Sequence, residues 1–294
     1  KSIDKIYSAE TWINELRVTG LKQKGGYAAQ AKLQVAFADL MEINAAANYS
    51  SVGWGALDQR LQERNRKEEV GYDLVGTVKI DKFFPEKAKL NIPMYVQYTR
   101  EESRLQYDPY EQDISVNESK SLAKYDPDKT EQDVADRSRE TTTTKSINFT
   151  NIKTGVSTKK PFPWSPNNFA FTYAYTETTK TNPLIKEEAT SQRIMSMEYN
   201  YNTKGASIEP FKFIKVDALK FISNFNLNLL PNRFGFNTKL DDYQGHRTFR
   251  EPQLPVYRFD DQRYKWDRNY VLDWNLAKSL RLNFKANVNS VVDR

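Results

Sequence analysis

The sequence contains no cysteine and a single histidine, His246. Without cysteine the chain cannot form disulfides, thiolate nucleophiles or cysteine-ligated zinc and iron–sulfur centres. It also lacks the run of about 18 apolar residues that a membrane-spanning helix needs. A glycine-rich phosphate loop and a nucleophile elbow are missing as well. We therefore expect no enzyme, no cofactor, no metal site and no helical membrane protein.

Positive and negative charges are interspersed along the chain. The 44 Lys and Arg residues outnumber the 38 Asp and Glu residues, which gives a formal net charge of +6. Nucleic-acid-binding proteins usually gather basic residues on one surface, whereas the densest basic run here, QRLQERNRKEE at 59–69, includes acidic residues. We therefore expect no nucleic acid among the partners.

Aromatic residues are abundant, and many of them alternate with small residues. In NNFAFTYAYTE, Phe169, Phe171, Tyr173 and Tyr175 occupy every second position. Successive side chains of a strand point to opposite faces, so the rings share one face. A face of rings backed by small polar residues is typical of a strand between lipid and an aqueous lumen. An amphipathic strand of a soluble β-barrel is the alternative.

Alternation of this kind recurs along the chain. The segments are residues 27–39, 42–50, 71–81, 89–99, 145–152, 168–177, 193–202, 233–243, 269–277 and 280–289. The links after every second segment are long and charged, at 51–70, 100–144, 178–192 and 244–268. Long outer loops alternating with short periplasmic turns are typical of outer-membrane barrels. The sequence thus predicts an all-β fold, an antiparallel transmembrane β-barrel segment of about ten strands with long extracellular loops.

One segment has helical periodicity. In KVDALKFISNF, residues 215–225, apolar residues recur three positions apart, and Asp217 near the start is a candidate N-cap. The link that contains this segment follows an odd-numbered strand. We therefore expect one short amphipathic helix at the periplasmic rim.

The alternation also predicts which side chains share a face. We expect lipid to contact Phe171, Tyr173, Met195, Phe236 and Trp274. The opposite face is too charged for a packed protein interior, and we expect it to line the lumen with Lys32, Asn44, Asp73, Lys79, Glu198, Lys239, Asp273, Arg281 and Lys285. A soluble sandwich would expose the same polar residues, so the charged face alone does not separate the two folds.

Two of the expected outer loops are candidates for contacts with partner proteins. The loop at 244–268 carries Tyr257, Phe259, Tyr264 and Trp266 among Arg and Asp residues. Aromatic residues and Arg are enriched at protein interfaces. The loop at 100–144 is the second candidate. Solvated loops without a partner are the alternative for both.

Several stretches, in order along nearly the whole chain, resemble one protein family. They are TWINELRVTG, KGGYAAQAKL, FFPEKAKLNIPM, KSINFTNI, EPFKFIK, FNLNLLPNRFGFNT and RNYVLDWNLAKSLRLNF. They resemble the SprA (Sov) family of Bacteroidota, the outer-membrane translocon of the type 9 secretion system. The resemblance implies that the chain is an internal or C-terminal section of a very large single-chain β-barrel.

The resemblance also implies a function. Family members export folded cargo proteins that carry C-terminal targeting domains, and they support gliding motility where it occurs. They work with a PorV-type barrel partner and a periplasmic plug protein, in the outer membrane of a Gram-negative bacterium. The family supplies no catalytic or cofactor residues to carry over.

The resemblance divides the chain into two parts. TWINELRVTG resembles the last strand of a β-sandwich inserted outside the barrel, so we expect residues 1–26 to be that end and its link, and 27–294 to be barrel. An ordinary barrel strand is the alternative for this stretch. Both ends look cut from a longer polypeptide. The functional alternatives are a small autonomous porin and a soluble carbohydrate-binding module that uses Trp54, Trp164 and Trp266.

Overall fold

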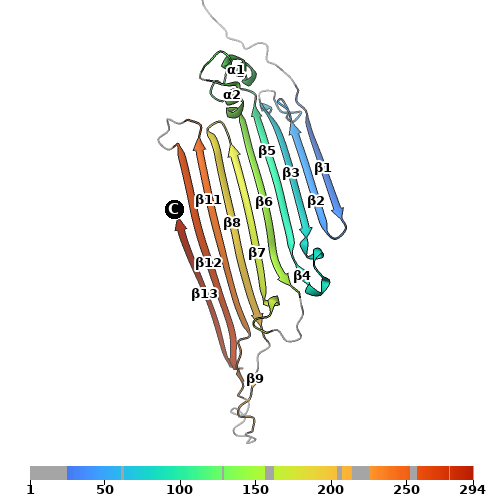
Figure 1. The fold of residues 1–294 in the computed structure, drawn as a ribbon, viewed down its shortest axis with the longest axis vertical. Coiled ribbons are helices and arrows are strands. Elements are labelled where there is room, and N and C mark those ends of the chain that lie inside the picture. The colour runs from blue at the N-terminus through green and yellow to red at the C-terminus, as the bar shows by residue number, and fades with distance from the viewer. Residues whose placement is uncertain are drawn as a thin grey trace, which may run out of the picture.

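The protein forms one antiparallel sheet with a small helical cap at one end (Figure 1). The computed structural model describes residues 25–60, 63–127, 129–155, 162–203, 207–213, 225–251, 257–277 and 279–293. The strands of the sheet, in spatial order, are β1 (Ala28–Phe37), β2 (Met41–Ser50), β3 (Lys67–Lys79), β5 (Pro93–Leu105), β6 (Arg139–Thr154), β7 (Phe169–Thr181), β8 (Ile185–Asn202), β11 (Arg233–Phe249), β12 (Arg258–Ala277) and β13 (Leu280–Asp293). Spatial order follows chain order, so the sheet is a meander.

Short elements complete the described structure. The strand β4 (Leu90–Asn91) pairs with β6 beside the main path, and β9 (Ser207–Ile208) pairs with β10 (Leu227–Asn228) in a separate two-stranded sheet. The links contain the 3₁₀ turns η2 (Ile80–Phe83), η3 (Glu86–Ala88) and η4 (Pro166–Asn168). Pro93 is the first residue of β5, a position where a strand tolerates the missing N–H.

The sheet is open. Strands β1 and β13 lie at its two edges, and no backbone pairing joins them within the described residues. Segments 27–39 and 280–289, the first and last of the predicted strands, are therefore not hydrogen-bonded to each other. The all-β fold class is confirmed.

The strands at the cap end are longer than predicted, and the four expected loops there are correspondingly shorter. Strands β7 and β8 enclose a turn at 182–184 instead of a loop at 178–192, and β11 and β12 continue through most of 244–268. The predicted strand ends were set by the alternation of apolar and polar residues. That alternation stops where the side chains on both faces of the strand are polar. Backbone pairing does not depend on that alternation and continues, for example between Thr248 and Arg258.

The loop expected at 100–144 is also wrong in its bounds and character. Strand β5 continues to Leu105, β6 begins at Arg139, and two helices lie between them, α1 (Val116–Ala123) and α2 (Glu131–Arg137). Each helix has a side-chain N-cap: Ser115 accepts from the Glu118 N–H, and Thr130 forms a capping box with Asp133. We call residues 106–138 the cap.

Two predictions concern segments beyond the described residues. The helix expected at 215–225 falls almost entirely in 214–224, and the sandwich-like segment expected at 1–26 falls almost entirely in 1–24. Among the described residues, no helix is long and apolar enough to cross a membrane.

The sheet has no second layer among the described residues. Only four hydrophobic residues there are buried, namely Ala123, Val134, Tyr201 and Ala277, and two of them belong to the cap. Large apolar side chains of the strands are instead exposed; Leu33 is 61% exposed and Phe284 52%. The sheet therefore presents apolar side chains that no other part of the described chain covers.

Candidate functional site

The strand register divides the sheet into two chemically different faces. Directly opposite residues of an antiparallel pair point to the same face. Tyr173 lies opposite Phe149 and Met195, Met195 lies opposite Leu240, and Leu240 lies opposite Trp266. The pairing therefore aligns apolar side chains in one row across five neighbouring strands.

The five residues predicted to contact lipid all lie on this face, which we call the aromatic face: Phe171, Tyr173, Met195, Phe236 and Trp274. The register adds further apolar members, among them Leu33, Val35 and Phe37 on β1, Met41 and Ile43 on β2, Leu74 and Val78 on β3, Met94, Val96 and Tyr98 on β5, Ile147 on β6, and Leu282, Phe284 and Val288 on β13. Together they form a continuous apolar band.

The band ends in polar side chains toward the cap. On the aromatic face, the next positions along β5, β6 and β7 are Arg100, Lys145 and Glu177. On β8 and β11 they are Arg193 and Asp242, whose side chains form an ion pair of 3.1 Å. The strands therefore extend beyond the apolar band at this end, with polar residues on both faces.

The nine residues predicted to line a lumen all lie on the opposite face, which we call the polar face: Lys32, Asn44, Asp73, Lys79, Glu198, Lys239, Asp273, Arg281 and Lys285. Side-chain hydrogen bonds link neighbouring strands across it. Thr99 Oγ1 donates to Asp73 at 2.6 Å, and Gln192 Nε2 donates to Asp241 at 2.8 Å. Charges of both signs are mixed over this face.

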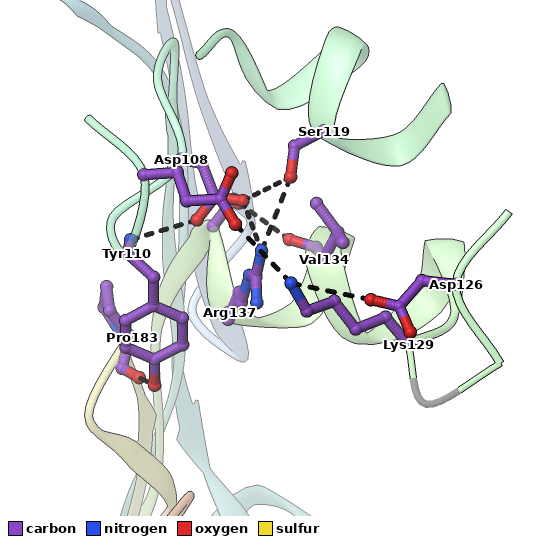
Figure 2. A network of polar contacts seen from close by, with 10 residues as sticks. Asp108, Tyr110, Ser119, Asp126, Lys129, Val134, Arg137 and Pro183 are labelled. Carbon is purple, nitrogen blue, oxygen red and sulfur yellow. Dashed lines mark hydrogen bonds and ion pairs between the residues drawn. The ribbon is translucent and has the colours of Figure 1, made fainter. Parts of the chain in front are cut away.

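A buried carboxylate holds the cap together (Figure 2). Asp108 is fully buried and accepts hydrogen bonds from Ser119 Oγ at 2.5 Å, Arg137 Nη2 at 2.5 Å and the Tyr110 N–H at 3.0 Å. Burial alone raises the pKa of this carboxyl, but the three donors and the arginine charge outweigh it, so the pKa lies below its usual value. Helices α1 and α2 are therefore joined through an ionised aspartate.

The cap is also attached to the neighbouring links. Tyr110 Oη donates to the Pro183 carbonyl in the β7–β8 turn at 2.8 Å, as Figure 2 shows. Arg250, just after β11, donates to the carbonyls of Asp136 and Asn182, both at 2.9 Å. Three connections of the sheet are thus tied together at the cap end.

Aromatic side chains gather at the opposite end of the aromatic face. Tyr199 Oη donates to the Pro163 carbonyl at 2.7 Å, and the flanking rings of Phe162 and Trp164 stack with centroids 5.3 Å apart. Trp274 Nε1 donates to the Asn228 carbonyl at 2.9 Å, which fixes β10 beside β12. Indole and phenol groups therefore border the apolar band at this end.

The four residues predicted to lie on a partner-binding loop do not share a loop. Tyr257 precedes β12, whereas Phe259, Tyr264 and Trp266 belong to the strand itself. Tyr264 and Trp266 point to the aromatic face and Phe259 to the polar face. The reason is that β12 pairs with β11 from Arg258 to Asp273, so alternation along the strand separates these side chains.

The Asp108 cluster and both cap helices are functional candidates that sequence reasoning missed. Their signal was present as the capping patterns SVNE at 115–118 and TEQD at 130–133, in which a hydroxyl residue precedes an acidic one by three positions. In the part of the chain that the structure describes, no group of three or more His, Cys, Asp or Glu residues is arranged to hold a metal ion.

Comparison with known families bears directly on the chain. The family model SprA_N, described as a motility related/secretion protein, matches residues 3–120. Over these residues the chain is similar to the SprA family. The match begins before β1 and continues through β5 into α1 of the cap. No curated protein matches the chain. The similarity at residues 3–120 suggests a role related to motility or secretion.

Proposed function

We propose that this chain forms part of the wall of the protein-conducting channel of the type 9 secretion system, in the outer membrane. In this proposal the aromatic face contacts lipid and the polar face lines the lumen. One observation carries it, namely that the register of a single-layered sheet separates apolar from charged side chains without a second layer to cover the apolar side. Exposed apolar areas of this extent mark interaction or membrane surfaces.

The dimensions of the apolar band support the proposal. On β3 the band runs from Val70 to Val78 on one face, and at about 3.3 Å per residue this is roughly 26 Å along the strand. Outer-membrane barrels carry an outward apolar band about 25 Å tall. The aromatic residues at the end away from the cap, such as Trp274, fit the aromatic girdle of such a band.

The polar face suits the passage of folded proteins. A wall that binds cargo tightly would block transport, and this wall mixes both charge signs, as with Asp73 and Lys79 on β3. On β7 the residues of the polar face are Ala174, Thr176 and Thr178, whose small side chains extend only a short distance from the sheet into the proposed lumen. The partners we propose are a PorV-type barrel protein, a periplasmic plug and secreted cargo with C-terminal targeting domains.

A soluble sugar-binding module is less well supported. Such a module would cover its apolar face with a second layer, and the described residues contain none. Its candidate platforms are also separated, since Trp54 follows β2, Trp164 precedes β7 and Trp266 lies within β12.

Cysteine substitutions at neighbouring positions test the face assignment. Residues 1–294 contain no cysteine, so Tyr173→Cys and Ala174→Cys in the full-length protein give matched labels on opposite faces of β7. We expect a membrane-impermeant maleimide to label Ala174→Cys in proteoliposomes and lipid-borne quenchers to reach only a fluorophore at Tyr173→Cys. Equal labelling and equal quenching at both positions would contradict the proposal.

A further inference from the structure

A hollow lies on the aromatic face where the apolar band ends toward the cap. Its volume is about 670 Å³, and Tyr175, Glu177, Ser191, Gln244, Asp260 and Gln262 contribute to its lining. The register places Glu177, Ser191, Gln244 and Gln262 in one row across β7, β8, β11 and β12. The floor of the hollow is β8, where the side chains of Ala189 and Ser191 are small. Larger side chains on the flanking strands form its sides.

The position of the hollow selects for an amphipathic ligand. Tyr175 is the last aromatic residue of the band on β7, and Glu177 is the next residue on the same face. On β8 and β11, Met195 and Leu240 lie two rows away, beyond the Arg193–Asp242 ion pair. A molecule seated here would have its polar part in the hollow and an apolar part along the band.

The charges of the hollow argue against a phosphate group. Arg258 supplies the guanidinium in the lining, and its Nε already binds Asp260 at 3.0 Å. Glu177 adds a second carboxylate, 4.0 Å from Lys145. Asp261 is a third carboxylate of the lining. A phosphate would therefore meet three carboxylates and a cation that is already paired, whereas anion sites in proteins present free Arg or Lys donors.

The remaining groups match a neutral, hydroxyl-rich ligand. Gln244 and Gln262 each offer a carbonyl acceptor and an amide donor, and the Ser191 hydroxyl both donates and accepts. Among the described residues, neither Ser191 Oγ nor the Gln262 amide has a hydrogen-bond partner. Carboxylates such as Asp260 and Glu177 add acceptors for hydroxyl groups, and the Tyr175 ring adds an apolar surface for a sugar ring.

We propose that this hollow binds the neutral sugar headgroup of a glycolipid in the outer leaflet. The inference rests on the proposed function, because it takes the aromatic face to contact lipid and the cap end to be extracellular. The acyl chains of this glycolipid would lie along the apolar band, on the side of Tyr175 away from the cap. The site would then fix one lipid at the boundary between the membrane and the extended strands.

Lipid retention by the full-length protein in nanodiscs tests this inference. The probes are diglucosyl diacylglycerol and phosphatidylethanolamine with the same acyl chains, counted by native mass spectrometry. We expect at least tenfold preferential retention of the glycolipid and its displacement by millimolar maltose. Ser191→Trp, which fills the hollow, and Gln262→Ala should each remove the preference. Arg263→Ala, at the other neighbour of Gln262, which lies on the polar face and does not line the hollow, should preserve it.

Three results would overturn the inference. They are equal retention of both lipids, which would indicate recognition of acyl chains, a preference that survives Ser191→Trp, and a glycolipid that maltose cannot displace. Loss of a protein partner from Gln262→Ala without a change in lipid retention would assign the hollow to protein binding instead. The Tyr173→Cys and Ala174→Cys labels report the face assignment separately, so failure of this inference is distinguishable from failure of the proposed function.

Discussion

Tyr173 on β7 lies directly opposite Met195 on β8, while the next pair along these strands, Ala174 and Ile194, points to the other face. A shift of one residue between the two strands would exchange these faces completely. The aromatic face is continuous only because every pair of neighbouring strands keeps its register. Substitutions on the two faces should therefore have different consequences, even at adjacent positions.

Phe236→Arg should destabilise the protein in lipid, because it places a charge within the apolar band of the aromatic face. Arg near the bilayer midplane of an outer-membrane barrel costs about 2–4 kcal/mol. The matched control is Asn237→Arg, on the polar face of the same strand, with an expected change of about 0.5 kcal/mol or less. Urea unfolding of the full-length protein in vesicles measures both, and a change below about 1 kcal/mol for Phe236→Arg would indicate that this position contacts water.

Asp108→Ala should loosen the cap, because it leaves Arg137 without its carboxylate and Ser119 without its acceptor. Removing one partner of a buried ion pair costs about 3–5 kcal/mol. We expect faster hydrogen exchange in α1 and α2 with unchanged exchange in β1–β3. Asp113→Ala, an exposed aspartate of the same segment, is the control, and equal effects of the two substitutions would contradict the role of Asp108.

The cap should lose stability as the pH falls. The folded-state pKa of Asp108 lies below its usual value, so its ionised form contributes stability above the unfolded pKa of about 3.9. That contribution is lost as the pH falls through the lower folded pKa. Hydrogen exchange of α1 and α2 between pH 7 and pH 3 measures this loss, and Asp108→Asn should flatten the pH dependence. An unchanged profile in Asp108→Asn would assign the loss to other carboxyl groups.

Arg250→Ala should uncouple the cap from the neighbouring links, because Arg250 donates to carbonyls of both α2 and the β7–β8 turn. We expect amide exchange around residues 182–184 to accelerate about tenfold, which corresponds to about 1.4 kcal/mol. Arg263→Ala, which removes a guanidinium that stacks on Tyr243, is the control. If both variants exchange alike at 182–184, Arg250 does not hold the turn.

The sequence predicted the strands best where one face is apolar and the other polar. Phe169 to Tyr175 and Leu280 to Val288 show this contrast, and there the predicted faces agree with the register. Thr141 to Thr144 carry the same residue type on both faces, so alternation gave no signal although threonine favours strands. Their place in β6 comes from pairing with β5 and β7.

The cap was harder to predict because its stability comes from a contact between distant residues. Asp108 and Arg137 are 29 positions apart, and neither has a neighbour in sequence that indicates the other. The two capping patterns identify helix starts but give no information on how the helices pack. Conversely, the candidate loop residues at 257–266 were assigned from composition, and composition does not reveal that a strand continues.

The meander order of the strands has a consequence for how the chain folds. Each strand of the main sheet pairs with the strands that precede and follow it in the sheet, and most of these are also its nearest neighbours in sequence. Contacts of low sequence separation close small loops, and chains rich in them fold faster than chains that must first join distant segments. The sheet can therefore grow one hairpin at a time, with each completed edge acting as the template for the next strand. The slowest step should be the joining of β6 to β5, because the longest link between successive strands of the path, the 33 residues 106–138 of the cap, must close before these two strands pair.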